Sequence, residues 1–455
     1  MATYDEVPAL LGKLKQRAID AYMVRDYAYP AGQMWSIEGD HYDISGKAKV
    51  TRPGEDGQGG GDWSGDMGWF FGLDGRKDEE FQGTFDTIRT RIDDAVDKWT
   101  ANLPKEADIK ADGDHAHLAM MKLGITPSQN GGTVNASGPM GGYLNLIAEG
   151  LDEMSGQTIE AFKGKFLSQL SRVIANQYAM TVPIGGALRA QENLWREARQ
   201  DVANTVQEAY DAMESVVNGA GPNWELLFKV VGWAAKGAGL FTSGGLKTAT
   251  EVVGLGVTIL TDGGNTNSDS GVSASQSCDS VLTALEESMK ALSERIGKEE
   301  KDLQANLDAN VQAFGQQMVG YDINQADSSL NVPDAQAANV DIVVINRSIV
   351  KGITDTHMPA VADELHAAAE SLWKAQSGAT LNRPDGIGVQ NGAQSFDLIY
   401  GLYESIRNLE WEVRAGAKTL DLVIQDHFAA DAASQRALDE HLQSVSGGSI
   451  WDPSD

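Results

Sequence analysis

Residues 278–320 read CDSVLTALEESMKALSERIGKEEKDLQANLDANVQAFGQQMVG, and this stretch decides the fold. Its apolar residues recur at helical steps of three, four or seven positions: Leu285, Met289, Leu292, Ile296, Leu303, Leu307, Val311, Phe314 and Met318. A nearly heptad seam of this kind predicts a long amphipathic helix that packs against other helices. The remaining face is charged throughout, which is typical of a solvated helix surface.

The same periodicity extends to both sides of this stretch. It predicts helices over 5–26, 77–102, 359–376 and 393–445, with a brief helical piece near 114–123. From Tyr143 onward a helix is expected to end at Val182-Pro183-Ile184-Gly185-Gly186, since proline and paired glycines are strong breakers. A second helix then follows over 187–217. The fold class is therefore mainly α, built from long antiparallel helical hairpins.

Residues 39–75 are rich in Gly and Asp and are expected to form a loop or an irregular excursion. The predicted organisation along the chain is as follows: an N-terminal helical and irregular Gly-rich region (1–140), a helical hairpin (141–217), an apolar Gly-rich segment with its linker (218–277), the long amphipathic helix (278–320), a connector (321–358), a C-terminal helical hairpin (359–446) and a tail (447–455).

Charge and cysteine usage exclude several classes of protein. The net charge is −29 and the sequence pI is about 4.5, so the chain lacks the basic face of a nucleic-acid binder and would be repelled by anionic lipid. Cys278 is the single cysteine, which excludes an intramolecular disulfide and a cysteine-based zinc cluster. The N-terminus has neither a basic start nor an apolar run. We therefore expect synthesis in the cytoplasm and, if the protein is exported to the medium or the cell surface, a route without a Sec signal peptide.

No catalytic constellation stands out in the sequence. His115 and His117 form the one local grouping with metal-ligand character, and two histidines need further ligands from elsewhere. A Gly-x-Ser-x-Gly sequence is missing, and no histidine lies near Cys278. We therefore predict no catalytic residues, no metal and no cofactor, and a non-enzymatic protein.

Residues 226–262 are apolar and Gly-rich, with Lys229, Lys236, Lys247 and Glu251 interrupting the run. A membrane-spanning helix needs ~20 apolar residues, so no constitutive membrane span is predicted. The segment is either a buried helical hairpin or a short apolar tongue stored between long helices. In the second case the arrangement resembles pore-forming toxins of the cytolysin A type, with these tongue candidates: Leu226, Phe228, Leu240, Phe241, Val257 and Leu260.

The stretch Met154-Ser155-Gly156-Gln157-Thr158-Ile159-Glu160-Ala161-Phe162 resembles the turn signature of the WXG family of type VII (ESX) secretion substrates. In that family Trp-x-Gly lies between two antiparallel helices, and a phenylalanine follows six residues after the glycine. Gly156 and Phe162 have this spacing, with Met154 in the place of the tryptophan. Trp63, Gly65 and Phe71 match the residue types better, but no predicted helix leads into them.

The resemblance also implies a Tyr-x-x-x-Asp/Glu export signal at the end of the second helix. Tyr210 and Glu214 fit this pattern at a predicted helix end. The hairpin 359–445 is similar to actinobacterial type VII effector hairpins of the EspC-like kind, and there His427 and Asp431 occupy the corresponding places. Side chains four residues apart share one helix face, where a receptor could read them together.

Three functions stay open from the sequence. The first is a secreted or secretion-associated protein of type VII character, which acts through protein–protein contacts with a helical WXG-like partner or a secretion ATPase. The second is an α-helical pore-forming toxin that uses residues 226–262. The third is a helical scaffold, with assembly into a homo-oligomer as an option.

Overall fold

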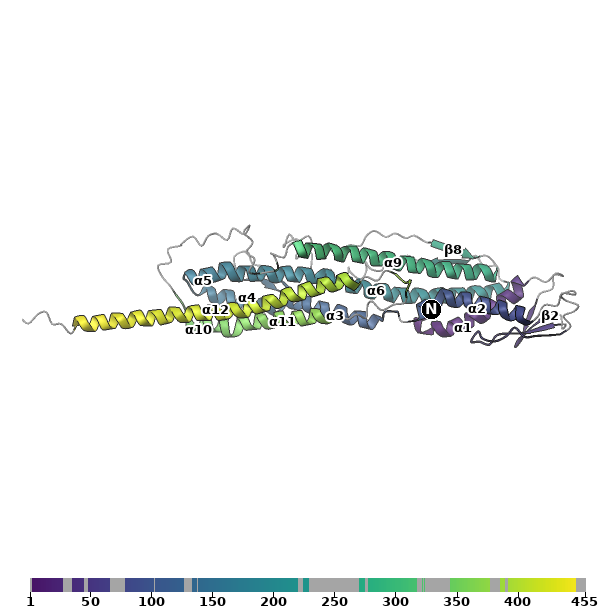
Figure 1. Cartoon of the computed structure of the whole chain (residues 1–455), viewed down its shortest axis with the longest axis horizontal. Helices are drawn as coiled ribbons and strands as arrows, with labels where there is room; N and C mark the ends of the chain where they lie inside the picture. The colour runs from purple at the N-terminus through teal and green to yellow at the C-terminus, as the bar shows by residue number, and fades with distance from the viewer. Residues whose placement is uncertain are drawn as a thin grey trace, which may run out of the picture.

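Long helices lie along one axis in an elongated bundle in the computed structural model of the chain (Figure 1). The structure describes residues 2–27, 35–44, 48–65, 78–101, 103–126, 133–136, 138–219, 224–228, 270–274, 277–316, 321, 323, 344–376, 385–388 and 392–446. Most of these residues are helical, which confirms the mainly α fold class.

The helices begin and end close to the limits of the predicted periodic segments in most cases. Their bounds are α1 Val7–Ala21, α2 Asp78–Thr100, α3 Glu106–Leu123, α4 Pro139–Asp152, α5 Gln157–Phe162, α6 Ser168–Asn218, α9 Cys278–Gln316, α10 Arg347–Gly352, α11 Met358–Lys374 and α12 Gly392–Ser446. A short 3-10 helix, η1 (Tyr4–Glu6), precedes α1, and single π-helical turns extend three of the helices: η2 (Tyr22–Asp26), η4 (Lys163–Leu167) and η6 (Ile353–His357). Helix α3 is much longer than the brief piece expected near 114–123.

The predicted turn at 182–186 does not exist, because α6 runs without interruption from Ser168 to Asn218 with Pro183 inside it. Residues 182–186 are all buried, and the packing of this stretch outweighs the helix-breaking tendency of Pro183, Gly185 and Gly186. The fixed φ of proline suits a helix, so the cost is confined to one lost hydrogen bond and ring crowding. The chain turns instead at residues 153–156, between α4 and α5.

Two apolar cores lie along the bundle and share α6 and α9. The first core joins α1, α2, the C-terminal half of α6 and the first part of α9, with Trp99 and Trp195 wholly buried. The second joins α3, α4, the N-terminal half of α6, α11 and α12, with Leu307 from the later part of α9. Each fully buried leucine or isoleucine contributes roughly 1.5–3 kcal/mol, so these cores supply the main stabilisation.

A four-stranded antiparallel sheet lies at one end of the bundle (Figure 1). Its strands, in spatial order, are β1 Ser36–Glu38, β2 His41–Ile44, β3 Ala48–Thr51 and β4 Trp63–Gly65. The expectation of a loop over 39–75 is therefore wrong for these residues. Strand β3 alternates buried and exposed residues, as a strand with one face on the core does. Gly39 (φ 67°) supplies the left-handed backbone conformation that the tight β1–β2 turn needs.

Helices α11 and α12 pack against each other in antiparallel orientation. The pairing is marked by Trp373 against Tyr403, with ring centroids 5.0 Å apart, and by Arg414 against Asp363 at 2.7 Å. Beyond Phe428 the helix α12 continues past the end of its partner helices, and every residue from 429 to 440 is exposed. Figure 1 shows this end of α12 projecting from the bundle.

Candidate recognition surfaces

The turn between α4 and α5 holds the residues that resemble the WXG signature. Met154 is buried, and the backbone of Ser155 pairs with that of Val344 in an isolated antiparallel bridge. Gly156 has φ 135°, in a region that side chains other than glycine rarely adopt. Glycine is therefore required where the chain reverses direction ahead of α5.

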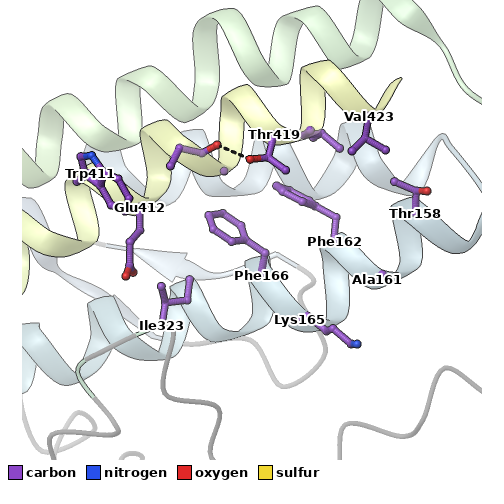
Figure 2. A pocket seen from close by; sticks show the side chains of 13 residues that line it. Thr158, Ala161, Phe162, Lys165, Phe166, Ile323, Trp411, Glu412, Thr419 and Val423 are labelled. Carbon is purple, nitrogen blue, oxygen red and sulfur yellow. Dashed lines mark hydrogen bonds between the residues drawn. The ribbon is translucent and has the colours of Figure 1, made fainter. Parts of the chain in front are cut away.

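Phe162 ends α5 and stacks on Phe166, with ring centroids 4.9 Å apart and planes at 24°. Both rings line a cavity of about 600 Å³ against α12, and Figure 2 shows them facing Thr419 and Val423 across it. Phe162 is only partly buried in the second core. The ring thus serves as the floor of a surface groove.

Trp63 and Gly65 do not form a turn between helices. They belong to β4, where Trp63 pairs with Val50 and Gly65 with Ala48 of β3. Trp63 packs against the first core as a partly buried side chain. Phe71, six residues beyond Gly65, lies outside the described residues.

Tyr210 and Glu214 lie in the last turns of α6, one helical turn apart. Tyr210 is partly buried against the first core. The Arg17 side chain of α1 donates to the Glu214 carboxylate across 3.4 Å, and that carboxylate side chain is 41% exposed. Tyr210 is therefore only partly accessible, whereas the Glu214 carboxylate keeps contact with solvent.

His427 and Asp431 lie where α12 leaves the bundle. Their side chains form an i,i+4 pair with 3.7 Å between Nε2 and Oδ2, and they are 39% and 69% exposed. Phe428, next to them, faces the Arg347 guanidinium of α10 at 6.0 Å from its ring centroid. The carboxylate of the second candidate signal, Asp431, is thus more exposed than Glu214, the carboxylate of the first.

A polar network anchors α12 to α11 on the bundle side of this projecting end. Glu410, only 9% exposed, accepts from Arg414 at 3.3 Å and also bonds Arg407. His366 of α11 lies 3.2 Å from the same carboxylate. Of these contacts, the one between His366 and Glu410 joins α11 to α12, whereas Arg407 and Arg414 lie on α12 beside Glu410.

Two paired strands flank residues 229–269, which contain most of the predicted apolar segment. Strand β7 (Trp224–Phe228) follows α6, and strand β8 (Ser270–Ala274) precedes α9. They pair antiparallel from Trp224↔Ala274 to Phe228↔Ser270, so the two ends of 229–269 are held together. Leu226 and Phe228 are in β7 and not in a helix, whereas Leu240, Phe241, Val257 and Leu260 lie outside the described residues.

Two observations on the described residues bear on metal binding and on nucleophilic chemistry. No three His, Cys, Asp or Glu side chains among these residues are grouped as metal ligands. Burial raises the pKa of the Cys278 thiol, which is the opposite of what activates a nucleophile. None of the described helices is both long and apolar enough to cross a membrane.

The groove along α12 is the feature that sequence reasoning missed. Its walls come from α5, η4, Ile323 and α12, which are distant in sequence. A signal was nevertheless present, because Tyr400, Trp411 and Leu422 recur every eleven residues and so share one face of a helix. That face is separate from the buried seam.

Comparison with known proteins gives no relative from which a function could be transferred. No family model, no curated protein and no solved structure matches the chain.

Proposed function

We propose that this chain is a secretion-associated, non-enzymatic helical protein of type VII character that acts through protein–protein contacts. In this proposal the exposed end of α12 is the element that a secretion receptor reads. The observation that carries it is the i,i+4 pair His427 and Asp431 on a helix whose residues 429–440 are all exposed.

Two further observations support the proposal. The α11–α12 hairpin is antiparallel, and the His366–Glu410 and Asp363–Arg414 pairs join its two helices. The left-handed Gly156 turn lies between two helices, as the WXG resemblance requires of its glycine. A preformed helix pays little ordering entropy on binding, which favours recognition of this kind.

Export from a host with an active type VII system tests the proposal. Asp431→Ala and His427→Ala should reduce the secreted fraction, measured by immunoblot of the culture medium, by about tenfold or more, the effect expected for a binding hot spot. Asp439→Ala is the matched control, because it removes an exposed carboxylate two turns further along the same helix. Equal export of all three variants, or no export of the unaltered chain, would refute the assignment.

Tyr210→Ala gives an independent comparison. If α12 carries the signal, this variant should be exported normally once its folding is verified by circular dichroism. Loss of export for Tyr210→Ala alone would move the signal to the end of α6.

A second candidate function, insertion into a membrane, is favoured by the β7–β8 pairing. The two strands hold the residues on either side of 229–269 together, next to α9, and 229–269 contains most of the predicted apolar segment 226–262. Dye release from uncharged phosphatidylcholine vesicles tests this, since anionic lipid would repel a chain of net charge −29. Micromolar protein should release dye, and a variant with 229–269 replaced by a Gly-Ser turn should not. Intact vesicles with the unaltered chain would exclude this function.

A further inference from the structure

A second apolar face of α12 points away from its buried seam. Tyr400, Trp411 and Leu422 are 47%, 68% and 58% exposed. Eleven residues correspond to about three turns, so the three side chains lie nearly in line along the helix. Large exposed apolar side chains that align in this way typically mark an interaction surface.

This face borders two cavities whose linings share Trp411 and Glu412, and together they are called the groove below. The cavity of about 600 Å³ has Phe162, Phe166 and Ile323 opposite α12. The second, of about 400 Å³, has Phe314 and Tyr321 opposite Tyr400. From residue 400 to residue 423 the groove follows α12 for roughly 35 Å, at 1.5 Å per residue.

The floor of the groove is preformed. Phe162 and Phe166 are stacked, and Gly416 of α12 allows Phe166 to approach, since a Cβ at residue 416 would lie 2.7 Å from that ring. Figure 2 shows Phe162, Phe166 and Ile323 lining the side opposite α12. A surface that needs little reorganisation retains more of its contact energy on binding.

We propose that this groove binds an amphipathic α-helix of a partner protein, about six turns long, with a narrow apolar stripe flanked by Lys or Arg. A straight apolar groove of this length matches the helix-in-groove mode of recognition, in which side chains at helical spacing fill successive cavities. Trp411, where the two cavities meet, is the anchor of the interface.

Charge defines the flanks of the partner helix. Glu404 and Glu412 line the groove, and Lys165 is the one cation among the residues that form the two cavities. Basic flanks complement this rim and the net charge of −29. A second copy of the chain fits poorly: the exposed end of its α12 would bring Asp426, Asp431, Asp439 and Glu440 with only Arg436 to offset them.

Two synthetic helical peptides test the proposal with the purified full chain. Both are 22 residues long with the same Ala-Leu stripe; one has lysine flanks and the other glutamate flanks. Fluorescence anisotropy of the labelled peptides at physiological salt should show micromolar binding of the lysine peptide and at least about tenfold weaker binding of the glutamate peptide. Trp411→Ala should weaken binding of the lysine peptide by about tenfold or more.

Leu438→Ala is the matched control, since Leu438 is similarly exposed, at 57%, on the same helix but beyond the groove. It should leave binding unchanged. Binding that survives Trp411→Ala would be general attraction to an acidic surface and would overturn the proposal, as would equal binding of both peptides. A dimer of the unaltered chain that Trp411→Ala dissociates in sedimentation would also overturn it, because the occupant would then be a second copy. This test needs no export, so it is independent of the function proposed for the end of α12.

Discussion

Arg52 forms a two-pronged ion pair with Asp20, with Nε donating to Oδ1 at 2.7 Å and Nη2 to Oδ2 at 2.5 Å. The Asp20 carboxylate, on α1, is wholly buried and also accepts from the Tyr42 hydroxyl of β2 at 2.8 Å. One acidic side chain in the first core therefore fastens the small sheet to the helical bundle.

Replacing Arg52 should destabilise the sheet end of the molecule. Arg52→Met leaves the Asp20 carboxylate buried with much less compensation, and loss of one partner of a buried pair typically costs about 3–5 kcal/mol. Urea unfolding followed by tryptophan fluorescence measures the loss. Lys290→Met is the control, because Lys290 is 77% exposed in its pair with Glu294 and should change the unfolding free energy by less than about 0.5 kcal/mol. Similar effects of the two variants would contradict this role of Asp20.

Asp201 should make the stability depend on pH. Burial beside α9 raises the pKa of its carboxyl from 3.8 to about 6. The Arg295 guanidinium, 3.6 Å away, lowers this pKa, and the Glu197 carboxylate raises it. A raised folded-state pKa contributes stability that is present below the unfolded value and lost as pH rises through the folded value. The unfolding free energy should therefore fall between pH 4 and pH 6, by about 3 kcal/mol at most from this group.

The variant Asp201→Asn tests this assignment, because an amide does not titrate. Its unfolding free energy, relative to the unaltered chain, should rise as pH increases from 4 to 6. Asp302→Asn on the exposed face of α9 should leave the pH profile unchanged. A profile for Asp201→Asn parallel to that of the unaltered chain would contradict the prediction.

Two glycines of the α4–α5 region should respond to alanine in opposite directions. Gly156→Ala places a side chain at φ 135° and should cost about 1–3 kcal/mol. Gly142→Ala lies within α4, where an added Cβ meets nothing within 4 Å, and should gain about 0.5–1 kcal/mol. Thermal unfolding monitored by circular dichroism compares the two. A gain from Gly156→Ala would show that the turn is not fixed as described.

Shortening α12 should separate folding from recognition. Ending the chain after Ala430 removes residues 431–455, of which 431–440 are all exposed. The unfolding free energy should therefore stay within about 0.5 kcal/mol of that of the unaltered chain. Ending it after Thr419 also removes the buried Leu420 and Ile424 and the partly buried Phe428, and should cost about 4 kcal/mol or more. Differential scanning calorimetry distinguishes the two, and a large loss from the first truncation would mean that the end of α12 is packed.

The helical seams were predictable because burial follows periodicity. Leu285, Met289, Leu292, Ile296, Leu303 and Leu307 are all at most 2% exposed, as the heptad-like spacing indicates. Pro183 misled the prediction, since local helix breaking was outweighed by tertiary packing that only the fold supplies. The strands of the sheet are three or four residues long, too short for alternation to be distinguished from a loop.

The candidate surfaces were predictable only in part. The i,i+4 spacing of His427 and Asp431 is visible in the sequence, whereas their exposure depends on where α10 and α11 stop. Tyr210 and Glu214 have the same spacing, yet Tyr210 packs against the first core and Glu214 pairs with Arg17 of α1. The groove needs Phe162 and Ile323 beside Trp411, and no periodicity within one segment can bring such distant residues together.

The uninterrupted α6 has a mechanical consequence. Its 51 residues give a rod of roughly 77 Å at 1.5 Å per residue, with one half in each core. The two cores can therefore move relative to each other only if α6 itself bends.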